Sequence, residues 1–305
     1  MQFLTNVNWD ILGKRKIAFT LSGLLILLGV VALIIHKGPI YNIDFKGGQI
    51  LEFGFGTPVD IGTIRSDVEK AGIAKAEIQS IGKGDIVSMK IPINVQVPEG
   101  KSISDVIIEQ LKNSYPNAEI ELRKSDIVGP KVSGELRKQA LLATLLALIG
   151  ILLYIAIRFN FRFGVASVIA LFHDVFITLG LMTILGREFS LPVLAALLTI
   201  VGYSINDTIV VSDRIRENMK ILYREKFYDL VNRSLNQTLS RTIITSLTVF
   251  IVLLAIIFFG GPVIFDFALA LLIGVVVGSY SSVYIVSPIV VAWENISPKK
   301  VGGKR

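Results

Sequence analysis

The sequence contains no cysteine and only two histidines among its 305 residues. Without cysteine the chain can form no disulfide, no thiolate metal site and no cysteine nucleophile, and cysteine usage gives no indication of its compartment. The two histidines, His36 and His173, do not make a metal-binding cluster. We therefore expect neither a metal nor another cofactor.

The sequence also lacks the motifs of nucleotide-driven and hydrolytic chemistry. It has no G-x-x-x-x-G-K-[ST] loop for phosphates, no G-x-S-x-G nucleophile elbow and no H-E-x-x-H motif. Chemistry driven by a P-loop is therefore unsupported, and we expect that the protein is not an enzyme.

Charged residues are scarce and unevenly placed. They make up 18% of the chain against 52% hydrophobic residues, and the mean hydropathy is +0.65, values typical of a membrane protein. A nucleic-acid-binding protein would need a basic face interleaved with aromatic residues. Here the net charge of +7 is modest, and the basic residues lie mainly at the ends of apolar runs. We therefore expect a lipid membrane, and no nucleic acid, as a partner.

Six apolar runs are long enough to cross a membrane. The first, residues 17–35, carries no charge and would span about 28 Å as a helix. A cleaved signal peptide would have a shorter apolar region and a small-residue cleavage site, which residues 36–39 do not offer, so an uncleaved anchor is favoured. The other five runs cover residues 140–157, 163–185, 191–212, 242–260 and 265–292.

The long polar stretch between the first two runs predicts a folded α+β domain. Its alternating and helical patterns occur in the order β-α-β-β-α-β, which is the ferredoxin-like arrangement. The predicted strands are 50–55, 77–81, 86–95 and 118–122, the predicted helices begin near Ile61 and after Ser102, and residues 82–85 form a hairpin turn.

The charges between the apolar runs predict how the chain is oriented. Every second connection is basic, which by the positive-inside rule places both termini and the connections 158–162 and 213–241 in the cytoplasm. We thus expect a polytopic α-helical membrane protein with six transmembrane helices and one extracytoplasmic ferredoxin-like domain. Its divisions are 1–36, 37–139 and 140–305.

Acidic residues interrupt two of the apolar runs. Placing a carboxylate such as Asp207 there costs about 2.5–3.5 kcal/mol on insertion scales, so we expect a proton, an ion or a buried partner at that position. Arg241, at the start of the next run, is the natural ion-pair partner of Asp207. Both residues also have structural interpretations, as a salt bridge and as an interfacial anchor. Asp174 lies deepest by residue count and could be protonated or bonded to His173.

Polar side chains recur at helical spacing in three successive runs, and we expect these stripes to face one another. Gly274, Gly278 and Ser282 are spaced four apart, which predicts a helix-packing stripe. The polar stripes comprise Ala170, Asp174 and Thr178; Thr199, Tyr203, Asn206 and Asp207; and Arg241, Thr242, Thr245, Ser246 and Thr248.

Several stretches, in order along the whole chain, resemble one family, the SecD/SecF protein-export subunits. The fourth-helix stretch resembles the SecF version of the family signature, and the chain lacks the longer outer domain expected of SecD. The matching stretches are the D-F-x-G-G motif at 44–48, the VGP-x-V-x-x-E-L-R segment at 128–137, His-Asp-Val at 173–175, the signature at 202–218, and the starts and centres of later helices at 240–248 and 278–282.

This resemblance implies a member of the resistance-nodulation-division superfamily in the bacterial inner membrane. It implies an accessory subunit of the Sec translocase that acts with SecD, the SecYEG channel, possibly with YajC, and an unfolded exported polypeptide. The pair would use the proton gradient for late-stage export, with Asp207, Arg241, Asp174 and Asn206 on the proton pathway. The alternatives are a small-molecule or ion exporter of the same superfamily, and a scaffold for the translocon without a motor role.

Overall fold

The computed structural model describes residues 7–73, 76–82, 84–93, 95 and 100–296. The chain divides into two compact units, which are described separately. The membrane unit comprises Met1–Ile40, Ala143–Glu188 and Pro192–Arg305, and the sheet unit comprises Tyr41–Leu142 and Phe189–Leu191.

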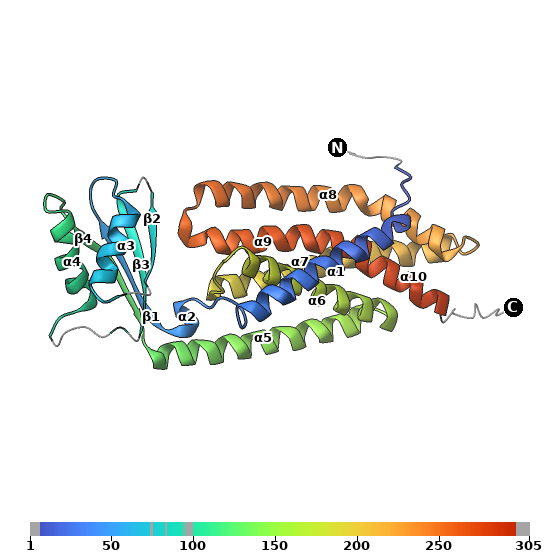
Figure 1. Ribbon diagram of the computed structural model, residues 1–305. Coiled ribbons are helices and arrows are strands. Elements are labelled where there is room, and N and C mark those ends of the chain that lie inside the picture. The colour runs from blue at the N-terminus through green and yellow to red at the C-terminus, as the bar shows by residue number, and fades with distance from the viewer. Residues whose placement is uncertain (1–6, 74–75, 83, 94, 96–99, 297–305) are drawn as a thin grey trace. The chain divides into compact units, whose positions relative to one another are not determined.

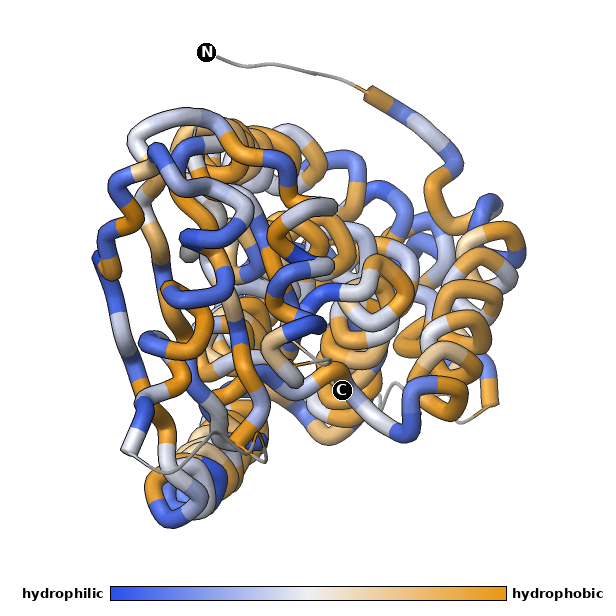
Figure 2. The backbone as a smooth tube through the Cα atoms, turned by 60° about the vertical axis from the view of Figure 1, so that its left-hand side comes forward, coloured by the Kyte–Doolittle hydropathy of each residue, from blue (hydrophilic) through white to orange (hydrophobic). Residues whose placement is uncertain are grey.

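Long apolar helices build the membrane unit (Figure 1). Among the described residues, six helical segments are long and apolar enough to cross a membrane, which confirms the predicted polytopic class. Figure 2 shows hydrophobic residues concentrated along these helices. The helices are α1 (Arg15–Ile35), α5 (Pro130–Arg158), α6 (Phe161–Ile184), α7 (Leu191–Ile221), α8 (Phe227–Phe259), α9 (Pro262–Ser281) and α10 (Ser287–Ile296), with short 3-10 and π-helical turns at Leu12–Lys14 and Ser282–Val286.

Helices α5, α7 and α8 extend well beyond the apolar runs that predict them, and α5 begins at Pro130, ten residues before its predicted run. Most of 213–241, expected as a loop, is helical, and only residues 222–226 separate α7 from α8. The extensions are amphipathic: Ile215 on α7 and Leu230 and Val231 on α8 are buried in one apolar cluster. Hydropathy averaging ends a span where charges begin, whereas a helix continues as long as one face is buried.

Backbones approach closely where α1 crosses α6. A Cβ atom added to Gly180 would lie 2.6 Å from the Cα atom of Gly29, a distance that requires one backbone to shift. Only glycine at both positions allows this contact, in the manner of small residues at membrane helix interfaces.

The sheet unit has the predicted β-α-β-β-α-β order, and its strands pair antiparallel in the order β2-β3-β1-β4. The last strand begins three residues later than predicted, and the third ends at Pro92, since proline cannot donate to the ladder. Lys83 of the predicted hairpin turn lies outside the described residues. The elements are α2 (Ile43–Lys46), β1 (Gly48–Gly54), α3 (Ile61–Lys70), β2 (Glu77–Ile81), β3 (Ile86–Pro92), α4 (Ile103–Ser114) and β4 (Glu121–Val128).

An apolar core lies between the sheet and its two helices. Leu51, Phe53 and Met89 from the strands pack with Ile64 and Ile107 from the helices, all fully buried. Side-chain caps start both helices, because Asp60 accepts from the amide of Thr63 and Ser102 accepts from the amide of Asp105.

Candidate functional site

Asp174 on α6 is fully buried and its carboxylate is saturated with partners. Its Oδ1 atom lies 2.8 Å from His173 Nδ1, and its Oδ2 atom accepts from Ser204 Oγ at 2.6 Å and Ser281 Oγ at 2.8 Å. These partners come from α6, α7 and α9, so the carboxylate holds three helices together.

A hydrogen-bonded chain continues from His173 to α1. His173 Nε2 lies 2.9 Å from Ser22 Oγ, Ser22 Oγ lies 3.1 Å from the Tyr280 hydroxyl, and Tyr280 donates to the Ala18 carbonyl at 2.7 Å. Because Tyr280 has one hydrogen and donates it to Ala18, the bond to Tyr280 must come from Ser22, and His173 must then donate to Ser22. The hydrogen bond between His173 Nδ1 and Asp174 Oδ1 then contains one proton. Whichever side chain holds that proton, the two together carry no net charge.

Asp207 on α7 is also buried, with 6% of its surface exposed, but its carboxylate is only half satisfied. Its Oδ1 atom accepts from Thr242 Oγ1 of α8 at 2.8 Å. Its Oδ2 atom is buried and has no hydrogen-bond partner among the described residues. A charged oxygen without a partner is costly in an apolar interior, so Asp207 is the carboxylate best suited to bind a proton.

The predicted ion pair between Asp207 and Arg241 is wrong in this structure. Within the described part of the chain, no Asp207–Arg241 contact of 4.0 Å or less is found, and Arg241 is exposed. Successive helical residues are about 100° apart. Thr242 contacts Asp207, whereas its neighbour Arg241 is exposed and acts on the carboxylate through its charge without a direct contact, and Asn206 is likewise exposed beside buried Asp207.

The polar stripes of α6, α7 and α8 meet only in part. Asp174, Ser204, Asp207 and Thr242 are buried together as expected. Further residues at helical spacing instead form an outward stripe, which the prediction placed inside. These outward residues are Thr199 and Asn206 of α7 with Arg241, Thr245 and Thr248 of α8, and Gly202, which was in no predicted stripe, is exposed beside them.

The spaced residues of α9 lie against α7. A Cβ atom on Gly274 would lie 2.1 Å from the Cδ1 atom of Ile200, and one on Gly278 would lie 3.1 Å from the Cβ atom of Ser204. Ser282 Oγ lies 3.0 Å from Thr208 Oγ1, one residue beyond Asp207. Helix α9 becomes a π-helical turn at Ser282, and such turns are frequent at functional sites.

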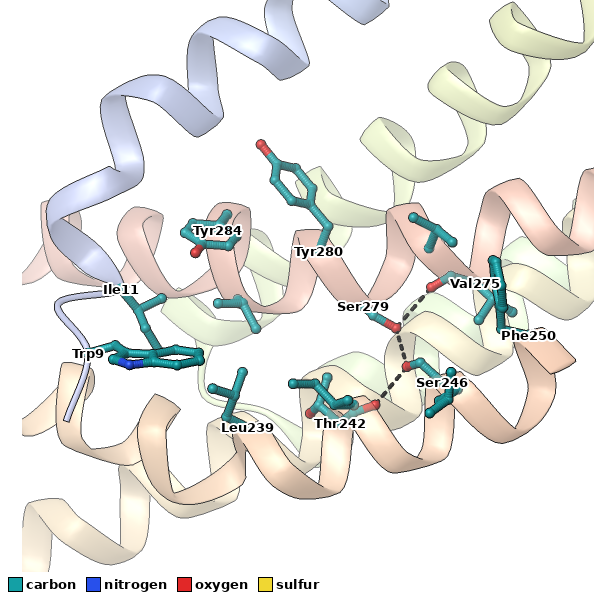
Figure 3. Close-up of a pocket in the computed structure, with 14 residues that line it drawn as sticks. Trp9, Ile11, Leu239, Thr242, Ser246, Phe250, Val275, Ser279, Tyr280 and Tyr284 are labelled. Atoms are coloured by element: carbon teal, nitrogen blue, oxygen red, sulfur yellow. Dashed lines mark hydrogen bonds between the residues drawn. The ribbon is translucent and has the colours of Figure 1, made fainter. Parts of the chain in front are cut away.

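A groove of about 470 Å³ lies between α8 and α9 (Figure 3). Ser246 Oγ donates to the Thr242 carbonyl at 2.8 Å and lies 2.5 Å from Ser279 Oγ. Tyr203 of α7 also donates to Ser246, at 3.4 Å. Thr242, which binds Asp207, lines this groove, and so a series of hydroxyl groups extends from the groove towards the half-satisfied carboxylate.

Comparison with known proteins identifies the family. The model described as "Protein export membrane protein SecD/SecF, C-terminal" matches residues 106–296. The chain belongs to the SecD/SecF family. "Protein translocase subunit SecF" of Calditerrivibrio nitroreducens is 42% identical over 93% of this chain and 93% of its own length. The SecF of Endomicrobium trichonymphae is 39% identical over 99% of this chain and 96% of its own length.

A fused member of the family carries this region inside a longer chain. "Protein translocase subunit SecDF" of Thermus thermophilus is 43% identical over 96% of this chain, which covers 40% of that protein. The crystal structure of SecDF from the same genus superposes with a TM-score of 0.83 at 42% identity, over 97% of this chain and 40% of that one. In that relative, SecD and SecF are therefore parts of one polypeptide.

The structure adds Ser22, a residue that sequence patterns did not single out, and gives contacts to two residues of the matching stretch 278–282 that had no predicted role. Ser22 binds His173, Tyr280 binds Ser22, and Ser279 lines the groove. Serine and tyrosine in apolar helices carry a weak signal, because serine also bonds its own helix backbone, as Ser279 does to the Val275 carbonyl.

Proposed function

We propose that the chain is a SecF-type subunit of the protein translocase, which acts with SecD to couple proton flow to late-stage export of polypeptides. The proposal is supported by full-length relatives named SecF at about 40% identity. It places the protein in the bacterial inner membrane, with both termini in the cytoplasm and the sheet unit outside, as the charges of the connections indicate.

The observation that carries the proton role is the unpartnered Oδ2 atom of buried Asp207. A proton on this oxygen removes the charge and turns an acceptor into a donor. The Oδ1 atom still accepts from Thr242, but the new donor on Oδ2 needs an acceptor, so the groups around this oxygen must rearrange to supply one. One proton that crosses 100 mV supplies about 2.3 kcal/mol, which is enough to shift a conformational equilibrium of a few kcal/mol.

Asp174 has a different part in this proposal, although the sequence placed it on the same pathway. Its two oxygens already have three partners, and His173 balances its charge. Asp174 therefore holds α6, α7 and α9 together as one group, and this group moves relative to α8 when Asp207 takes up a proton.

The outward stripe supports SecD as the partner within the membrane. Exposed Arg241 and Asn206 would be costly against lipid, and a neighbouring helix with polar or acidic groups removes that cost. A Cβ atom at Gly202 would meet nothing in the described chain within 4 Å, so this glycine is free for close approach by a partner helix. SecYEG, possibly YajC, and the emerging polypeptide would contact other surfaces.

The test is export into vesicles that contain the chain, its SecD partner and the channel. Asp207→Asn keeps the size and the Thr242 bond but cannot titrate, and we expect it to abolish the stimulation by a proton gradient while ATP-driven export continues. Glu217→Gln, an exposed acid on the same helix, is the matched control and should export normally. Undiminished stimulation with Asp207→Asn would contradict the proton role and favour a scaffold.

A further inference from the structure

The motif at residues 44–48 begins the sheet unit and is tightly constrained. Asn42 accepts from the Asp44 amide at 2.9 Å and starts α2. Gly47 has φ of 76°, and a Cβ atom on Gly48 would lie 2.7 Å from the Ile91 carbonyl oxygen. The backbone turn that enters β1 therefore needs glycine at these positions, and it presents Asp44 in a fixed direction.

Asp44 binds the first residue of α7. Its Oδ2 atom accepts from the Asn42 side-chain amide at 3.0 Å and from the Leu191 backbone amide at 3.1 Å. Leu191 belongs to the same compact unit as Asp44, and Pro192 follows it without an N–H group. The first amides of a helix have no partner inside it, and a carboxylate at this end also interacts favourably with the helix dipole.

Aromatic and backbone contacts surround this bond. The backbone amide of Asn42 donates to the Phe189 carbonyl at 3.2 Å, and Tyr41 pairs with Phe189 in a parallel bridge. Phe45 is 4% exposed and stacks on Phe189 with ring centroids 5.6 Å apart. Arg137 of α5 donates to the Phe45 carbonyl. The segment that precedes α7 is thus held on several sides.

We propose that Asp44 is a positioning residue that fixes the first turn of α7 to the sheet unit. Helix α7 carries Asp207 and continues directly from Leu191, so with Leu191 held by Asp44 a displacement of α7 on proton binding is passed to the sheet unit. This inference rests on the proposed proton role of Asp207. It adds the contact at which a movement of α7 would be transmitted to the sheet unit.

The first experiment removes the bond. Asp44→Ala in the complete translocase should reduce gradient-stimulated export about tenfold, since small misplacements have large kinetic effects. ATP-driven export and association with SecD should be unchanged. Asp44→Asn retains an acceptor and should restore most of the stimulation. Asp126→Ala, an exposed acid on β4, is the matched control. Equal stimulation in Asp44→Ala and wild type overturns the inference.

The second experiment replaces the bond by a covalent link. The natural chain has no cysteine, so Tyr41→Cys with Phe189→Cys introduces a single pair at bridged positions. In the Asp44→Ala background, oxidation should restore gradient-stimulated export and reduction should remove it. A linked protein that stays inactive overturns the inference, because a rigid connection would then not be what Asp44 provides.

Hydrogen exchange separates this inference from the proposed function. The Leu191 amide should exchange about fivefold faster in Asp44→Ala, the loss typical of a removed helix cap. This readout does not depend on Asp207. If Asp207→Asn exports normally while the Leu191 amide responds to Asp44, the proton role fails and the link stands. An unchanged Leu191 amide overturns the link itself.

Discussion

Asp174 and Asp207 are both buried acids in apolar helices, but their surroundings differ in every other respect. Asp174 has three hydrogen bonds and a histidine that balances its charge. Asp207 has one hydrogen bond, an oxygen without a partner in the described chain, and no ion pair there. Burial alone therefore does not distinguish the two acids, whereas the number of partners does, and our proposal assigns the proton to the acid with fewer partners.

The helices around the two acids differ in the same way. On the Asp174 side, Gly29 and Gly180 bring α1 and α6 into backbone contact. On the Asp207 side, Gly202 meets nothing and Arg241 is exposed. The first side is closed and fixed within the chain, and the second is open to a partner.

Removal of Asp174, the acid whose carboxylate has three hydrogen bonds, should have the largest effect on stability. Asp174→Ala leaves His173 and Ser204 without their buried acceptor, and loss of one member of a buried pair costs about 3–5 kcal/mol. Asp207→Ala should cost much less, because only Thr242 loses a bond. Thermal unfolding of both variants in detergent measures the difference. Similar losses for the two would remove the distinction between the sites.

The second-largest loss of stability is expected at the glycine contact between α1 and α6. Gly180→Ala overpacks the crossing of α1 and α6 and should destabilise the protein by about 1–3 kcal/mol. Gly150→Ala, on α5 with open space around it, is the control and should be neutral or slightly stabilising. Unfolding midpoints that match for both variants would show that this side of the bundle is not close-packed.

A substitution on the Asp207 side of the bundle should weaken the association with SecD and leave the stability of the chain unchanged. Gly202→Leu fills the space left for a partner helix and should weaken co-purification with SecD about tenfold, or about 1.4 kcal/mol. The unfolding midpoint of the isolated chain should stay unchanged. Gly150→Leu controls for a large side chain on an exposed helix. Normal association of Gly202→Leu would place the partner on another face.

The smallest effect on stability is expected from two exposed acids of the sheet unit, Asp60 and Asp105. The amide of Thr63 holds the pKa of Asp60 below its ordinary value of 3.8, and the Ser102 hydroxyl does the same for Asp105. A lowered folded pKa stabilises above the unfolded value, so both caps should weaken only as pH falls below about 3.8. Hydrogen exchange in the first turns of α3 and α4 measures this loss. In Asp60→Asn with Asp105→Asn, the acid-dependent change should disappear.

Apolar length and alternating patterns were sufficient to predict six membrane helices and the order of the sheet unit. They ended α7 too early and began α8 too late, because a helix that buries Ile215 or Leu230 on one face carries charges on the other. They buried Asp207 and Thr242 correctly but paired the acid with Arg241, the residue next to its true partner. Contacts such as Asp44–Leu191 join residues 147 positions apart, and no local pattern encodes them.

The most direct measurement is the protonation of each carboxyl group in the working complex. Infrared difference spectra, recorded as a proton gradient is imposed, report carboxyl groups that gain or lose a proton. We expect a carboxyl band that is absent in Asp207→Asn and unchanged in Asp126→Asn, with no contribution from Asp174. A band that persists in Asp207→Asn, or that comes from Asp174, would contradict the assignment of Asp207 as the group that carries the proton.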